Sequence, residues 1–236
     1  MLASAIITEV AADLLDTSYE RWTEAMLLDY LNAGESHLVY FKPTAYVVTG
    51  VYQLIAGTKQ ALPDGTSSYQ NPSAVTLKKA IELIKITRNM GSDGLTSGAS
   101  IQIVTPQDID DMFPGWRAVA ASATVLNTIF DIKDRTVFEV FPQQPTSSMG
   151  WIEAVYSAVP TELAASSESI NLSAEYAEPL RNYMKYRAYS MDGATSEFAS
   201  SRAQAHWNLF LTQIGRKDLL ENKYKGKPYD GSNQQL

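Results

Sequence analysis

Cysteine is absent from this chain of 236 residues, and histidine occurs only twice, at His37 and His206. Without cysteine, the protein has no disulfide framework, no thiolate metal site and no cysteine nucleophile. Two histidines so far apart in the sequence also argue against a multi-histidine metal centre within one chain. The sequence therefore turns attention away from thiol and metal chemistry.

A surplus of basic residues is also missing. The chain has 19 lysines and arginines against 26 aspartates and glutamates, so its net charge is −7 and its pI is about 4.9. A free-standing nucleic-acid-binding protein usually has a basic surplus. The charge balance therefore disfavours a function as a free nucleic-acid binder.

Long apolar runs are absent as well. The longest, such as residues 25–28, contain four or five residues, whereas a membrane-spanning helix needs about 20. The N-terminal segment has no basic residue before Glu9 interrupts it, which is not the pattern of a signal peptide. We therefore expect no membrane partner and a protein that is made and used in a cytoplasm-like compartment.

The composition that remains is that of a globular protein. Hydrophobic residues make up 45% of the chain and charged residues 19%, which excludes a wholly disordered chain. At roughly 150 residues per domain, the length predicts one or two domains.

Helical periodicity marks both ends of the chain. The first helix is predicted from an apolar face formed by Ile6, Ile7, Val10, Ala11 and Leu14. A second helix is expected to begin after Thr23, a good N-cap, and to end before Pro43. Its apolar face comprises Leu27, Leu31, Gly34 and Leu38. Two further helices, at 180–191 and 198–214, are predicted to form an antiparallel hairpin that Gly215 terminates.

The last predicted helix has two neighbouring stripes of residues along its surface. Phe198, Arg202, Ala205 and Leu209 form one, and Ala203, Trp207, Phe210 and Ile214 form the next.

The middle of the chain is rich in β-forming residues. Strands are predicted at 47–48, 51–55, 59–63, 81–87, 130–132, 136–141 and 151–158. The turn residues 56–58 predict a hairpin between the two strands that flank them. A flexible, exposed stretch is expected at 91–100, and a short helix or turn at 107–113.

This order of helices, strands and helices predicts an α+β fold. The simplest architecture is a helical bundle built from both ends of the chain, with a β-rich segment inserted between them. The predicted parts are N-terminal helices at 1–47, the β-rich insertion at 48–160, a C-terminal helical hairpin at 161–215 and an extended tail at 216–236.

Recognisable catalytic and binding motifs are absent. The chain has no P-loop, no G-x-S-x-G elbow and no H-E-x-x-H sequence. The cluster of Asp108, Asp110 and Asp111 could suggest a metal, but it is more typical of a solvated turn that caps a helix. Glu20 and Glu24 could share a helix face, yet such pairs arise by chance among 26 acids. We therefore predict no catalytic, cofactor-binding or metal-binding residues, and no cofactor.

Aromatic residues are the remaining candidates for a binding function. The most prominent are Trp22, Tyr30, Tyr40, Phe41, Trp116, Trp151, Tyr183, Tyr186, Tyr189 and Trp207. Most lie at helical or strand core spacing, so packing in the core is the first interpretation. Oligomer contacts are the second, because Tyr and Trp are enriched in interfaces. From its residues alone, the chain is more readily a scaffold or interaction protein than an enzyme.

One family resemblance runs through the chain. Asp16, Arg21 and Trp22 match a D-x-x-x-x-R-W pattern, and residues 27–32 match the L-x-x-Y-L-N helix end that follows it. Further similar segments follow in order at 51–63, 83–89, 130–131, 137–145, 151–160 and 180–215. Together these segments, which span roughly residues 14–215, resemble the head-to-tail adaptor proteins of tailed bacteriophages.

The resemblance implies a structural protein of the virion and no enzymatic activity. Such adaptors form a dodecameric ring below the portal, extend the DNA channel and provide the attachment surface for tail components. The implied partners are the portal protein, nozzle or tail-tube proteins, and further copies of the chain as a homo-dodecamer. Double-stranded DNA is implied only as passing cargo. The implied location is the neck of the virion, with the host cytoplasm during assembly.

The resemblance also implies that the tail is the interface with the portal or a neighbouring subunit. Its candidate contact residues are Arg216, Lys217, Lys223, Tyr224, Lys225, Lys227 and Tyr229. A segment this polar cannot build its own core and tends to order on a partner. We therefore expect a free protein that is monomeric or weakly associated.

Two alternatives remain open. The chain could be another virion assembly or structural protein with the same helical bundle, which would bind a different partner. It could also be a tail-associated peptidoglycan hydrolase that uses a pair of carboxylates.

Overall fold

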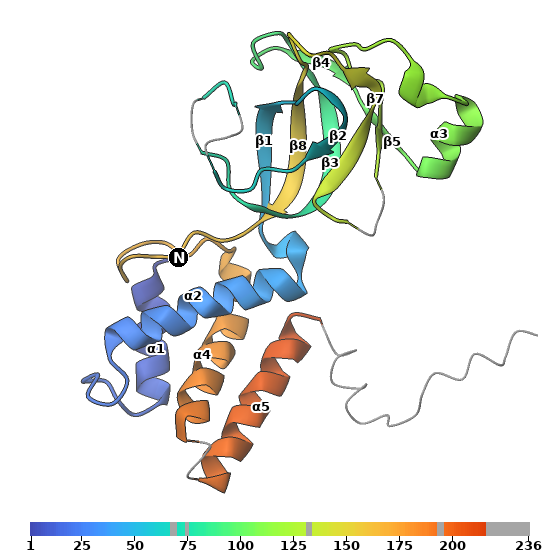
Figure 1. The fold of residues 1–236 in the computed structure, drawn as a ribbon. Coiled ribbons are helices and arrows are strands. Elements are labelled where there is room, and N and C mark those ends of the chain that lie inside the picture. The colour runs from blue at the N-terminus through green and yellow to red at the C-terminus, as the bar shows by residue number, and fades with distance from the viewer. Residues whose placement is uncertain (67–69, 74–75, 131–133, 193–195, 216–236) are drawn as a thin grey trace, which may run out of the picture. The chain divides into compact units, whose positions relative to one another are not determined.

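The computed structural model describes residues 1–66, 70–73, 76–130, 134–192 and 196–215 (Figure 1). These residues form five α-helices and two four-stranded sheets, so the predicted α+β class is confirmed. The chain divides into two compact units. We call Pro43–Pro160 the β unit, and Met1–Lys42 with the described part of Thr161–Leu236 the helical unit.

Four helices make up the helical unit: α1 (Ala3–Asp13), α2 (Glu24–Phe41), α4 (Ala177–Asp192) and α5 (Glu197–Gln213). Helix α4 follows a 3₁₀ turn, η3 (Ala174–Tyr176), and contacts each of the other three helices. A Cβ added at Gly34 would lie 3.0 Å from Cδ1 of Tyr183. Glycine at this position therefore lets α2 and α4 approach closely.

The predicted helix ends are confirmed by their local chemistry. The Thr23 side chain accepts a hydrogen bond from the Met26 amide, which begins α2, and the helix ends two residues before Pro43. Gly215 follows α5 with φ of +83°, the left-handed conformation that favours glycine.

The two stripes of α5 differ in burial. Ala203, Phe210 and Ile214 of the second stripe are buried, whereas Phe198 and Leu209 of the first are 66% and 47% exposed. The predicted faces of α1 and α2 are both buried.

The β unit contains two sheets. One has the strand order β1 (Val47–Gln53), β8 (Trp151–Ala158), β3 (Ala80–Met90) and β4 (Ser97–Ser100). The other has the order β2 (Gly57–Ala61), β7 (Val137–Gln144), β6 (Asn127–Ile129) and β5 (Gln102–Val104). All pairings are antiparallel except that between β5 and β6. Apolar side chains of both sheets, including Tyr52, Phe138 and Tyr156, form one shared core.

The predicted hairpin at residues 56–58 is wrong. Strand β1 pairs with β8 and β2 pairs with β7, so the chain crosses from one sheet to the other at this point. The Gln60 side chain stabilises this crossing. Its amide oxygen accepts a hydrogen bond from the Ile55 backbone amide, and its amide nitrogen donates to the carbonyls of Ile55 and Gly57. A side chain therefore satisfies backbone groups that strand pairing would satisfy in a hairpin.

Three smaller predictions can be compared with the structure. The strand expected at 130–132 is displaced to Asn127–Ile129, and residues 131 and 132 lie outside the described residues. The stretch expected to be flexible at 91–100 includes strand β4. The short helix near 107–113 is confirmed as α3 (Pro106–Met112), and a further 3₁₀ turn, η2 (Trp116–Ala118), follows it.

Candidate interaction surfaces

The seven tail residues predicted as an interface all lie outside the residues that the structure describes. They are Arg216, Lys217, Lys223, Tyr224, Lys225, Lys227 and Tyr229. Within the described residues, the helical unit carries further candidate surfaces.

The loop between α1 and α2 is organised around the Asp16 carboxylate. It accepts hydrogen bonds from the backbone amides of Glu20, Arg21 and Trp22 at 2.9, 3.0 and 2.8 Å. These bonds, that from Trp22 foremost, hold the pKa of Asp16 below its ordinary value. The Arg21 guanidinium lies 4.7 Å from the ring centroid of Trp22 and pairs with Asp192 at the end of α4. The D-x-x-x-x-R-W pattern therefore specifies a structured loop.

The second part of that motif ties distant parts of the chain together. Asn32 on α2 exchanges two hydrogen bonds with the backbone of Leu163, at 3.0 and 2.9 Å. The Tyr30 hydroxyl donates to the sulfur of Met191, and the Arg187 guanidinium lies over the Tyr30 ring. These motif residues thus join the N-terminal and C-terminal parts of the helical unit, and their role is structural.

Glu35 is a buried carboxylate that motif searching did not identify. It is 1% exposed and accepts hydrogen bonds from the backbone and side-chain nitrogens of Asn171, both at 2.8 Å. A third, longer bond of 3.3 Å comes from the Leu172 amide. The sequence feature that could have identified Glu35 as buried is its position along the apolar stripe of α2, between Leu31 and Leu38.

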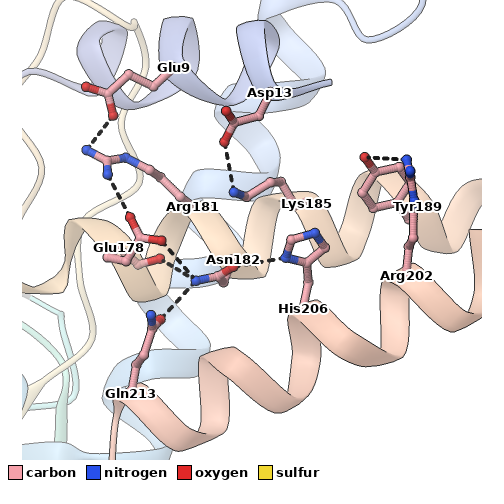
Figure 2. Close-up of polar contacts among 10 residues, drawn as sticks. All are labelled: Glu9, Asp13, Glu178, Arg181, Asn182, Lys185, Tyr189, Arg202, His206 and Gln213. Carbon is pink, nitrogen blue, oxygen red and sulfur yellow. Dashed lines mark hydrogen bonds and ion pairs between the residues drawn. The ribbon is translucent and has the colours of Figure 1, made fainter. Parts of the chain in front are cut away.

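Helix α4 carries a row of polar side chains toward α1 (Figure 2). Arg181 pairs with both Glu9 and Glu178. One turn on, Lys185 pairs with Asp13 at 2.8 Å. The α1–α4 contact is therefore partly electrostatic, and the acids that take part are already paired.

A second polar group lies between α4 and α5. The Asn182 amide donates to Gln213 at 3.0 Å, and its oxygen lies 2.9 Å from Nδ1 of His206 (Figure 2). Because the amide oxygen can only accept, Nδ1 carries the proton. Burial lowers the pKa of His206, with Lys185 acting in the same direction. His206 therefore serves as a neutral structural group at pH 7.

Six aromatic or imidazole rings form a cluster shared by α2, α4 and α5. Neighbouring ring centroids lie 5.0 to 6.4 Å apart among His37, Phe41, Tyr183, Tyr186, Trp207 and Phe210. An open groove of about 400 Å³ adjoins this cluster and is lined by Ser36, His37, Tyr40 and Phe41. We call it the α2 groove.

The aromatic predictions divide according to burial. Trp22, Tyr30, Trp116 and Tyr183 are buried, as the core interpretation expects. Tyr40 is 73% exposed, so core packing is wrong for this residue.

The carboxylate candidates also have structural positions. Asp108 completes a capping box with Thr105 at the start of α3, as predicted. Glu20 precedes α2, so it does not share a helix face with Glu24. Within the described residues, no cluster of His, Cys, Asp and Glu could hold a metal ion. In the same residues, no helix is both long and apolar enough to cross a membrane.

An apolar groove with an exposed aromatic ring at its edge is a feature found on surfaces that bind other proteins. The model of the SU10 adaptor protein family matches residues 1–229. The chain therefore belongs to the SU10 adaptor protein family, and its class is that of a phage adaptor, a structural component of the virion. The match also includes residues 1–13 and most of the tail, beyond the span that carries the sequence resemblance. A search of curated proteins found no match.

Proposed function

We propose that this protein is a head-to-tail adaptor that forms a dodecameric ring below the portal. In this proposal the ring extends the DNA channel and provides the surface to which nozzle or tail-tube proteins attach. The protein assembles in the host cytoplasm, resides in the neck of the virion and catalyses no reaction. The observation that carries the proposal is the family match over residues 1–229.

The domain roles follow the division of the chain. The predicted bundle of 1–47 and 161–215 would lie at the portal exit, and the β-rich insertion at 48–160 would be a second part of the same subunit. The tail at 216–236 would reach the portal or a neighbouring subunit. Ordering it costs about 1–2 kcal/mol per residue in backbone entropy, so it should order only where contacts offset that cost.

Exposed side chains of the helical unit are consistent with ring contacts. A closed ring needs a head-to-tail contact, in which two different surfaces of one subunit meet those of its neighbours. Leu15 beyond α1 is 92% exposed, and Phe198 on α5 is 66% exposed. Leu15 lies in the loop between α1 and α2 and Phe198 lies on α5, so the two residues belong to different parts of the helical unit, as such a contact requires.

The net charge agrees with a channel through which DNA slides. Each lysine or arginine that contacts a phosphate adds affinity through counterion release. A subunit with a net charge of −7 would therefore hold passing DNA weakly.

The test is binding to the portal protein encoded with this chain. The full chain should co-purify with assembled portal, and a chain that ends at Gly215 should bind at least tenfold more weakly. Far-UV circular dichroism of both proteins controls for folding. A full chain that folds and does not bind portal would contradict the proposal, and equal binding of the two chains would remove the tail from the interface.

A further inference from the structure

The α2 groove is an apolar surface that the described residues leave open. It lies at the C-terminal end of α2 and is lined by Ser36, His37, Tyr40 and Phe41. The Tyr40 ring is 73% exposed beside it. An exposed aromatic ring at the rim of an apolar groove is characteristic of a binding surface.

The groove lies close to the point where α5 ends. The Phe41 ring centroid is 6.0 Å from that of Trp207 and 6.4 Å from that of Phe210, both on α5. Gly215 is five residues beyond Phe210, which is about 7.5 Å of helix rise. Figure 1 shows the C-terminal ends of α2 and α5 at the same end of the helical unit.

The chain that follows Gly215 has suitable chemistry for this groove. Its first five residues are Arg216, Lys217, Asp218, Leu219 and Leu220. Leu219 and Leu220 are the only aliphatic residues of the tail before the last residue of the chain. Five extended residues span up to about 17 Å, enough to bring both leucines back along the last turns of α5.

The charge distribution favours the same contact. Residues 1–42 and 161–215, which contain the helical unit, include 13 acidic and 6 basic residues and so have a net charge of −7. The tail has 5 basic and 3 acidic residues, a net charge of +2. The last turn of α5 contains no basic residue, so Arg216 and Lys217 would meet the negative end of its dipole. The exposed face of Tyr40 can also accept a cation.

We propose that residues 216–220 fold back on the same molecule and place Leu219 and Leu220 in the α2 groove. Attachment to the same chain gives the leucines an effective concentration on the order of millimolar, which favours the molecule's own groove over that of another copy. In the proposed adaptor, this leaves residues 221–236 as the part of the tail that reaches the portal or a neighbour. The docking itself does not depend on that function.

The absence of cysteine allows a direct test in the full chain. Ser36→Cys places one thiol in the groove and Glu221→Cys places the other next to the leucines, while the groove aromatics and both leucines remain. The matched control carries the same two cysteines together with Leu219→Asp and Leu220→Asp. Brief mild oxidation of the dilute monomer should form the intramolecular disulfide at least tenfold faster in the first protein than in the control.

Each other outcome overturns the proposal. Equal rates in the two proteins would show that the leucines do not dock. Disulfides that form only between molecules would assign the groove to the tail of a second copy. Because the experiment contains no portal protein, failure of portal binding leaves its result unaffected.

A second measurement needs no cysteine. Tyr40 is largely exposed, so Tyr40→Ala should remain folded, as circular dichroism can verify. Trypsin should then cleave after Arg216 and Lys217 at least fivefold faster in Tyr40→Ala than in the unaltered protein. Cleavage at the same rate in both would also overturn the proposal.

Discussion

Replacing Glu35 by alanine should destabilise the helical unit strongly. The carboxylate is 1% exposed and accepts two hydrogen bonds of 2.8 Å and one of 3.3 Å from Asn171 and Leu172. Hydrogen bonds to a charged group contribute about 1.5–3 kcal/mol each, and an unsatisfied buried donor costs about 1–3 kcal/mol. These bonds also fix the segment before η3 onto α2.

The size of the loss of stability in Glu35→Ala depends on which donors lose their hydrogen-bond acceptor. The Asn171 side chain still donates to the Thr161 carbonyl at 2.8 Å, so it remains partly satisfied. Among the described residues, the backbone amides of Asn171 and Leu172 donate to Glu35 and would lose this acceptor. Removing the carboxylate also removes its own desolvation cost, which offsets part of the loss. We therefore expect Glu35→Ala to lower the free energy of unfolding by about 3 kcal/mol.

Glu35→Gln removes the negative charge and nearly keeps the size and shape of the side chain. One oxygen still accepts, but the new amide nitrogen faces a second donor at the Asn171 side chain. We expect a loss of about half that of alanine.

The assay is urea unfolding followed by far-UV circular dichroism, which reports mainly on the helices. Glu162→Ala is the matched control, because Glu162 is an exposed glutamate near the same segment and should change stability by less than about 0.5 kcal/mol. If Glu35→Ala unfolds at the same urea concentration as Glu162→Ala, the structural role assigned to the buried carboxylate is refuted.

Three further predictions follow from local geometry. Hydrogen bonds lower the pKa of Asp16. Its contribution to folding stability is therefore present above the ordinary pKa of 3.8 and is lost as the pH falls through the lower pKa of the folded state. Asp16→Asn should reduce Tm at pH 7, and this reduction should shrink below pH 3.8. Burial lowers the pKa of His206. As the pH falls, the unfolded chain therefore binds a proton at this residue near pH 6.5, whereas the folded chain binds it only at lower pH. Tm should fall between pH 7 and 5, and it should fall less in His206→Gln. A Cβ at Gly150 would lie 1.9 Å from the Ala123 carbonyl oxygen, so Gly150→Ala should cost about 3 kcal/mol in urea unfolding. Gly115→Ala, where the methyl meets no atom within 4 Å but φ is +79°, should cost about 1 kcal/mol.

Local signals predicted the helices well because helix ends depend on neighbouring residues. Thr23 caps α2 through the Met26 amide three residues on, and Gly215 follows α5 in the left-handed conformation. The periodic faces of α1 and α2 were also visible in the sequence, because burial on one side leaves a repeat of three and four residues.

Features that depend on long-range pairing were not predictable in the same way. The turn residues 56–58 indicate that the chain bends, but they do not reveal which strands β1 and β2 will join. The partners β8 and β7 are more than seventy residues away, and the role of Gln60 emerges only once the two sheets are packed.

The candidate surfaces also depend on contacts between residues that are distant in the sequence. Glu35 looked like an ordinary acid on a helix, because its hydrogen-bond donors come from residues 171 and 172. The residues that line the α2 groove all lie on α2, but the neighbouring rings of Trp207 and Phe210 reach Phe41 only because α5 packs beside α2. The family resemblance identified the class of protein through motif residues, such as Asp16 and Asn32, whose own roles are structural.

The most direct test of the adaptor function is the mass of the native assembly. Native mass spectrometry of the purified chain should show a monomer or weak oligomers when it is alone. After mixing with assembled portal, the account predicts a complex that contains a dodecameric ring of this chain. A chain that remains monomeric beside intact portal, with no complex at any mixing ratio, would contradict it.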